Sequence, residues 1–158
     1  MNRIVILGTG HATVTRCYNT CFVLQTDTTT LLVDAGGGNG ILQRLKQAGI
    51  AIKDLHHMYV THAHTDHILG TIWVIRMVLS AAGYEGRFHI YSHAKVLRVI
   101  SMICGETLSA KHRRLMGERV VMHEVGDGTG FNVGDIGMQS FDIHSKKEPQ
   151  YGFRAMLP

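Results

Sequence analysis

The chain has 158 residues, of which 45% are hydrophobic and 18% carry a formal charge. This length suits one domain with its own core, and this composition excludes an intrinsically disordered chain. The net charge of +4 permits an anionic partner but does not by itself indicate nucleic-acid binding.

The cysteines and the apolar runs indicate the cellular compartment in which the protein is found. The three cysteines include no CxxC pair, which predicts reduced thiols. The longest apolar run begins at Ile68, contains Arg76 and is shorter than a membrane span. The apolar run near the first residue is too short for a signal peptide. We therefore expect a cytoplasmic protein without membrane contact.

Short β-branched runs fill the first part of the chain. Residues 3–7 predict a strand that stops at a glycine, and residues 21–26 and 30–34 predict a hairpin. Helical spacing of apolar residues follows over 41–49, and residues 57–60 predict another strand. This part of the chain therefore predicts a meander of strands followed by a helix and a further strand.

Helices and strands then alternate. The predicted elements are a long helix capped by Asp66 and ending near Gly83, a strand over 87–91, a helix capped by Ser92, a short helix around 111–114, strands over 118–125 and 136–143 joined by a Gly/Asp-rich segment, and a last strand from Tyr151. The order predicts a single layered α/β or α+β domain over residues 1–158.

The segment THAHTDH places three histidines and an aspartate between a predicted strand and a predicted helix. His62 and His64 lie two residues apart, so in an extended stretch both side chains lean to the same side. Asp66 and His67 lie at the turn into the helix, where they can reach the same ion or a second one. A solvated polar loop is the alternative, but it does not explain this placement against an apolar helix.

Such a cluster suits hydrolysis. Imidazole binds Zn, Fe, Ni or Cu, and a carboxylate extends the choice to Mn or Mg. A bound metal lowers the pKa of water to about 7, and a second ion about 3.5–4 Å away can clamp both reacting oxygens.

HxHxDH after a strand, followed by Gly70, resembles the metallo-β-lactamase superfamily. The opening LGTG, then TRCYNTCFVL, LLVDAGGG and DIHSKKEPQYGFR are similar to its ribonuclease Z-like branch. The resemblance covers essentially the whole chain and implies an αββα sandwich with two divalent ions at one edge of the sheets. Zinc is the expected metal, with Mn and Fe as alternatives.

The resemblance also implies roles for individual residues. His62, His64 and His144 would hold one ion, and Asp66 and His67 would hold the other. Asp66 would also be the catalytic proton acceptor. Asp34 would orient a ligand histidine through a hydrogen bond.

The chain departs from this branch in three places. The loop has Ala63 and Thr65 where the branch carries leucine and glycine, and only glycines occupy 36–38 where an acidic residue is usual. The chain ends before the bridging aspartate and the last histidine ligand of the family. We therefore expect the N-terminal portion of a longer protein, lacking the C-terminal part of the fold.

The last predicted strand leaves the sheet with an unpaired edge. Such an edge tends to recruit another strand. We therefore expect a homo-oligomer, a strand exchange, or association with the missing C-terminal fragment.

Lys146 and Lys147 lie beside His144 and favour a phosphate-bearing substrate. An exposed turn before Pro149 explains them equally well. The basic run at 111–114 is typical of a solvated helix face.

Three functions therefore stay open. The first is a phosphodiesterase of ribonuclease Z-like type that uses metal-activated water, with RNA among its substrates. The second is a metallo-hydrolase of another ester, such as a sulfate ester, thioester or lactone. The third is a metal-binding fragment without catalysis.

Overall fold

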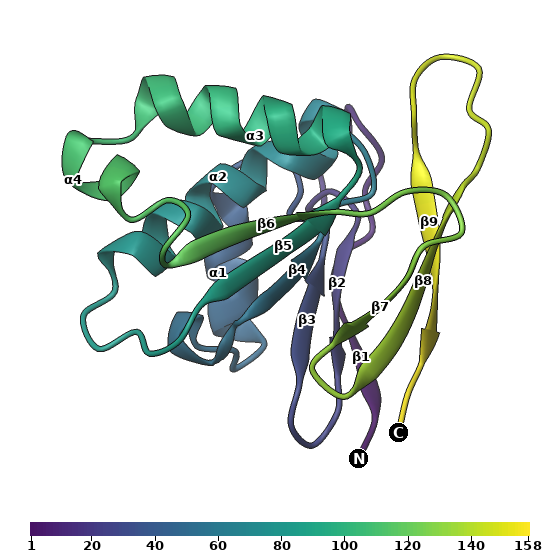
Figure 1. Ribbon diagram of the computed structural model, residues 1–158, viewed down its shortest axis with the longest axis horizontal. Coiled ribbons are helices and arrows are strands. Elements are labelled where there is room, and N and C mark those ends of the chain that lie inside the picture. Colours follow the sequence, from purple (N-terminus) through teal and green to yellow (C-terminus); the bar gives the residue numbers. More distant parts are fainter.

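The computed structural model describes residues 1–158. They fold into two sheets and a set of helices (Figure 1). The elements are β1 (Arg3–Gly8), β2 (Cys21–Gln25), β3 (Thr30–Val33), α1 (Gly40–Gln47), a 3-10 helix (Ile52–Asp54), β4 (His57–Tyr59), α2 (Thr65–Ser80), β5 (Phe88–Ser92), α3 (Ala94–Thr107), α4 (Ala110–Arg114), β6 (Val120–Glu124), β7 (Gly130–Val133), β8 (Ile136–Asp142) and β9 (Tyr151–Met156).

The first sheet has the order β1-β2-β3-β4-β5-β6. Its first three strands form the predicted antiparallel meander, and the remaining pairs are parallel. Parallel neighbours need crossover connections, which the helices supply. Figure 1 shows these helices together on one face of this sheet.

The second sheet, β7-β8-β9, is antiparallel and faces the other side of the first (Figure 1). Strand β7 was not predicted, because its four residues lie within the Gly/Asp-rich segment GDGTGFNVGD and begin at Gly130. Glycine weakens strand propensity, so the composition resembled a loop. Pairing with β8 over the whole of β7 outweighs that local preference.

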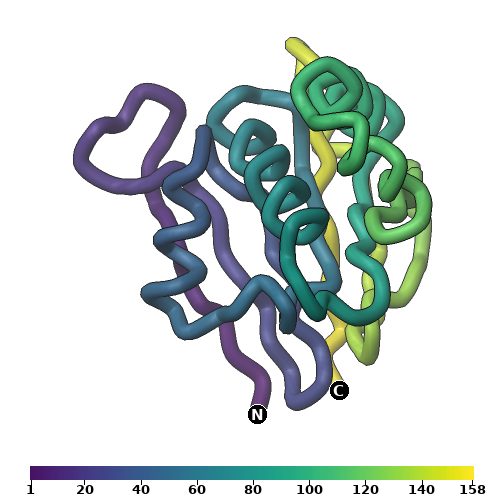
Figure 2. Tube along the Cα trace, turned by 90° about the vertical axis from the view of Figure 1, so that its left-hand side faces the viewer, coloured from purple at the N-terminus to yellow at the C-terminus, as the bar shows by residue number.

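Strand alternation divides the core in two. Met58 and Ile90 belong to the larger hydrophobic cluster beneath the helices. Their neighbours Tyr59 and Tyr91 belong to a smaller cluster shared with the second sheet. Successive strand residues face opposite sides, so both faces of the first sheet are buried. Figure 2 shows the helices on one side of the sheet in a view turned by 90°.

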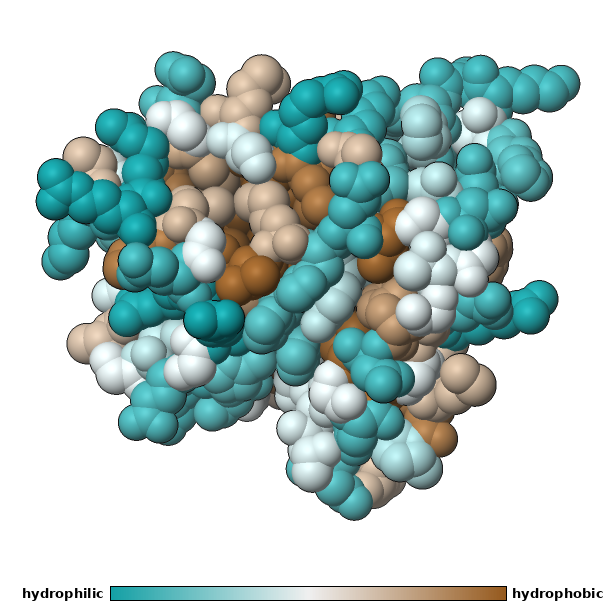
Figure 3. Space-filling model, viewed as in Figure 1, coloured by the Kyte–Doolittle hydropathy of each residue, from teal (hydrophilic) through white to brown (hydrophobic).

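Residues 1–158 thus form three layers: the helices, the first sheet and the second sheet. Figure 3 shows mostly hydrophilic residues around the outline of this face and hydrophobic residues gathered toward its middle. None of the helices combines the length and the apolar character that crossing a bilayer requires.

Two helix starts lie one or two residues away from their predicted caps. The N-cap of α2 is His64, so Asp66 lies in the first turn. The N-cap of α3 is His93, because Ser92 ends β5 and its hydroxyl donates a 2.5 Å hydrogen bond to Val60 O. Both helices follow parallel strands, β4 and β5, whose carboxyl ends lie at a common edge of the first sheet.

Candidate metal centre

Asp34 follows β3 and anchors the buried part of this edge. It is 4% exposed and adopts a left-handed φ of 54°, which aspartate tolerates better than most residues. Its Oδ1 accepts a 2.8 Å hydrogen bond from Thr61 N. Its Oδ2 lies 2.8 Å from the donating Thr61 hydroxyl and 2.7 Å from His67 Nδ1. One carboxylate thus fixes both the strand end and the first turn of α2.

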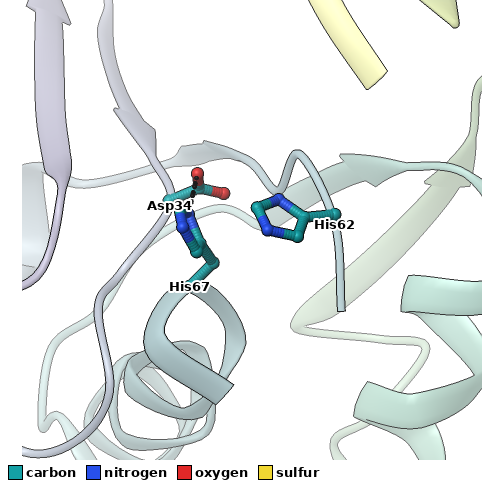
Figure 4. A group of neighbouring side chains, drawn as sticks. All are labelled: Asp34, His62 and His67. Carbon is teal, nitrogen blue, oxygen red and sulfur yellow. Dashed lines mark hydrogen bonds and ion pairs between the residues drawn. The ribbon is translucent and has the colours of Figure 1, made fainter. Parts of the chain in front are cut away.

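His62 and His67 face each other beside Asp34 (Figure 4). Their ring centres are 4.1 Å apart, and one ligand atom from each of Asp34, His62 and His67 lies within 4.8 Å of the others. His67 Nδ1 is committed to Asp34, and His62 Nδ1 lies 2.8 Å from the Thr61 hydroxyl. On each ring the Nε2 atom is therefore the nitrogen available to an ion.

His64 forms the outer part of the site. Its ring centre is 4.7 Å from that of His62, and its side chain is 47% exposed. Its Nε2 forms an ion-pair contact with Glu148, whose other carboxylate oxygen is 2.6 Å from Lys95 Nζ. This contact occupies Nε2, so Nδ1 is the His64 nitrogen available to an ion.

Asp66 lies beside the same group. Its Oδ2 is 3.3 Å from His67 Nε2, on the side of the ring that faces away from Asp34. This distance brings a carboxylate to the nitrogen that is free to bind a metal.

The structure does not bring His144 to this group. His144 lies in the β8–β9 loop with a left-handed φ of 56°. Its side chain is 85% exposed, and its Nδ1 lies 3.9 Å from Asp142 Oδ2. Lys146 and Lys147 are exposed in the same loop. A ligand role for His144 and a substrate role for the lysines stay predictions.

The glycines around Asp34 allow close packing. A Cβ atom added at Gly70 would lie 1.8 Å from Ala35 O, so α2 can pack here only with glycine. The Tyr18 hydroxyl lies 2.8 Å from Ala35 O and 2.7 Å from Gly38 O, and Asn19 Oδ1 accepts from Gly37 N. The loop after β1 therefore holds the glycine segment in place.

The environment separates the pKa values of the two inner histidines. Burial, together with neighbouring His67, lowers the pKa of His62, so this ring stays neutral and keeps a lone pair. Burial also acts to lower the pKa of His67, but the hydrogen bond and charge of Asp34 outweigh it and raise that pKa. At the outer position, the hydrogen bond from Lys95 lowers the pKa of Glu148.

These residues fit a divalent metal ion. Their donors are imidazole nitrogens and carboxylate oxygens, the set that zinc, manganese and iron accept. Each imidazole of the segment also contacts the protein through its other nitrogen, as ligand histidines in metal sites do.

Sequence reasoning did not identify Thr61, Glu148 and Lys95. Thr61 directly precedes the histidine motif, and this position was the signal that could have identified it. Glu148 and Lys95 are 53 residues apart, and only the fold brings them together at His64.

Curated relatives share part of this chain. Ribonuclease Z of Streptomyces avermitilis is 37% identical over 79 residues, covering 49% of this chain and 26% of that protein. Exodeoxyribonuclease YycJ of Bacillus anthracis is 30% identical over 128 residues, covering 80% and 42%. Ribonuclease Z of Aeropyrum pernix is 30% identical over 141 residues, covering 88% and 42%. The chain thus spans less than half the length of these relatives.

Solved structures show the fold. The short form of human tRNase Z superposes with a TM-score of 0.76 at 18% identity, covering 99% of this chain and 64% of that one. The metallo-β-lactamase fold protein YhfI of Bacillus subtilis gives 0.72 at 17%, covering 97% and 58%. The predicted metallo-β-lactamase-like fold is confirmed, with a distant similarity to ribonuclease Z.

A family model describes almost the whole chain. The model for Anti-Pycsar protein Apyc1 matches residues 2–155, which include the histidine segment, Asp34 and all but the last residue of the β8–β9 hairpin. The chain has the metallo-β-lactamase fold and belongs to the Anti-Pycsar protein Apyc1 family.

Proposed function

We propose that this chain is a metal-dependent hydrolase that cleaves phosphodiesters. The observation that carries the proposal is the arrangement of His62, His64 and His67. Each ring contacts a protein oxygen through one nitrogen. The second nitrogen is free in His62 and His64, and in His67 it lies 3.3 Å from the Asp66 carboxylate. Such preorganised donors suit an ion that activates water, whereas a solvated polar loop has no need of them.

The chain's own residues have distinct tasks in this proposal. A bound divalent ion supplies Lewis acidity and a water of lowered pKa. His62 and His64 would hold one ion, His67 and Asp66 would hold a second, and the hydrogen bond from Asp34 orients the His67 ring. Asp66 accepts the proton released from the attacking water, since its carboxylate lies at the metal-facing side of His67.

The electrostatics favour an anionic substrate. Helices α2 and α3 both begin at this edge, and the positive ends of their dipoles therefore lie near the site. Lys146 and Lys147 add positive charge on the neighbouring loop. These features attract a phosphate group without reading a sequence.

Relatives support this bond class. The names ribonuclease Z, exodeoxyribonuclease and, for a structure with a TM-score of 0.72, "a new diphosphatase from the PhnP family" all describe cleavage of phosphorus–oxygen bonds. RNA is therefore one substrate class to test, beside DNA and small phosphodiesters.

We propose two divalent ions, with zinc as the natural metal. The donors divide into two sets, His62 with His64 and His67 with Asp66, and the cluster of Asp34, His62 and His67 brings the two sets side by side. A structure of PqqB from Methylobacterium extorquens with a TM-score of 0.68 carries Zn²⁺. Zinc per chain, measured after reconstitution, tests the number of ions.

The test of function is hydrolysis of bis(p-nitrophenyl) phosphate with added Zn²⁺ or Mn²⁺. Wild type and His112→Ala, a histidine on α4 outside the site, should turn over, and His64→Ala should not. Turnover of a thioester or lactone without phosphodiester cleavage would instead support the second hydrolase class. Bound metal with no turnover of any ester would contradict catalysis by this chain.

We also propose that the chain associates through the open edge of β9. That strand pairs only with β8, and Met156 and Leu157 at its end are exposed, as are Ile4 and Ile6 on β1. An unpaired strand with apolar neighbours recruits another strand. Sedimentation velocity should show a second species as concentration rises, and a monomer at every concentration would contradict the proposal.

A further inference from the structure

Thr61 lies at the centre of the buried hydrogen-bond network, and its backbone is held on both sides. Thr61 N donates a 2.8 Å hydrogen bond to Asp34 Oδ1. Thr61 O accepts a 3.0 Å hydrogen bond from Tyr151 N, at the start of β9. The strand end and the second sheet therefore fix this residue, and its hydroxyl has little freedom of position.

The Thr61 hydroxyl has two polar neighbours and only one hydrogen. Its Oγ1 lies 2.8 Å from Asp34 Oδ2 and 2.8 Å from His62 Nδ1. A carboxylate can only accept, so the hydroxyl hydrogen points to Asp34. The hydroxyl oxygen must then accept from His62, which places the ring hydrogen on Nδ1.

This proton arrangement decides which His62 nitrogen can bind metal. A neutral imidazole with hydrogen on Nδ1 carries its lone pair on Nε2. In water the opposite form, with hydrogen on Nε2, is the commoner one for a histidine side chain. The protein therefore has to impose the form that leaves Nε2 free.

We propose that Thr61 is a positioning residue that connects Asp34 to His62 and holds the His62 ring in the form whose Nε2 binds the metal. Asp34 thereby orients two histidines, His67 directly and His62 through the Thr61 hydroxyl. The proposal rests on the metal site of the proposed function, but it concerns binding and not turnover.

The experiment compares wild type, Thr61→Val and Thr61→Ser. Valine keeps the branched shape and removes the hydroxyl, whereas serine keeps the hydroxyl. Long-range ¹H–¹⁵N spectra of the metal-free proteins at pH 8, with His62 assigned by its loss in His62→Gln, report which nitrogen carries the hydrogen. Competition with a chromophoric chelator gives the Zn²⁺ affinity.

We expect hydrogen on His62 Nδ1 in wild type and Thr61→Ser, and on Nε2 in Thr61→Val. Zn²⁺ affinity should fall about 10- to 100-fold in Thr61→Val and about 3-fold or less in Thr61→Ser. Hydrogen on Nε2 in wild type overturns the proposal without any variant. Equal Zn²⁺ affinity in wild type and a folded Thr61→Val, checked by circular dichroism, also overturns it.

These readouts need no substrate. Failure to cleave phosphodiesters, with the expected spectra and affinities, would reject the proposed function and leave the role of Thr61 intact. Phosphodiester turnover with hydrogen on His62 Nε2 would do the reverse.

Discussion

The inner and outer parts of the candidate centre are built differently. Asp34, Thr61, His62 and His67 are buried or half-buried and share hydrogen bonds of 2.7–2.8 Å within two strand ends and one helix turn. His64 is half-exposed and depends on Glu148 from the β8–β9 loop, while His144 in that loop faces solvent. The inner part is preorganised by the fold, and the outer part depends on one loop.

The largest effect should come from Asp34→Asn. The amide NH₂ would replace the oxygen that receives the Thr61 hydroxyl and His67 Nδ1, so donors would face donors in a buried site. We expect unfolding free energy to fall by about 3 kcal/mol, measured by urea denaturation. Zn²⁺ affinity should fall as well. A wild-type denaturation midpoint would show that the inner network contributes nothing to stability.

Gly70→Ala tests the packing behind the inner part. The new methyl group would overlap Ala35 O, so α2 has to shift away from the glycine segment. We expect a loss of about 1–3 kcal/mol from this overpacking. Gly105→Ala on α3 is the matched control, since a Cβ there meets open space and helix propensity should raise stability by up to about 1 kcal/mol. Equal stability changes in both variants would contradict the close approach at Gly70.

Glu148→Gln tests the outer part. Removing the charge weakens the contacts with His64 and Lys95, so Zn²⁺ affinity should fall about 10-fold. Stability should change by about 1 kcal/mol or less, since glutamine keeps the size of the side chain and one oxygen that can still accept from Lys95 Nζ. Lys147→Gln, on the same loop, should leave affinity unchanged in the same chelator competition. A stability loss as large as that of Asp34→Asn would remove the distinction between the two parts.

Acidification tests a region outside the candidate centre, at the opposite end of β4. Burial, with the charge of neighbouring His89, lowers the pKa of His57 to about 4. The unfolded chain takes up this proton near pH 6.5, so stability is lost as pH falls from about 6.5 towards 4. His57→Gln should flatten this slope in denaturation series at pH 7.5, 6 and 5. An unchanged slope would assign the acid sensitivity to other groups.

The same contrast explains what the sequence could predict. Spacing alone located His62, His64, Asp66 and His67, because the motif lies within one strand end and one helix turn. Residues that meet through tertiary structure, such as Glu148 at His64, leave no local pattern. Strand β7 was missed for a related reason, since cross-strand pairing overrides the propensity of its own residues.

The ligand role of His144 stays a prediction. A motif identifies a residue type at a position, but the backbone of an exposed loop decides where the side chain points. In this structure His144 has a left-handed φ, and its ring is exposed beside Asp142.

The hydrogen bond from Tyr151 N to Thr61 O gives the second sheet a direct link to the histidine segment. If the β8–β9 hairpin opens, the Tyr151 amide becomes exchangeable with solvent deuterium at the moment when Thr61 loses one of its two backbone restraints. The exchange rate of this single amide therefore reports how often the site loosens, and metal binding should slow it.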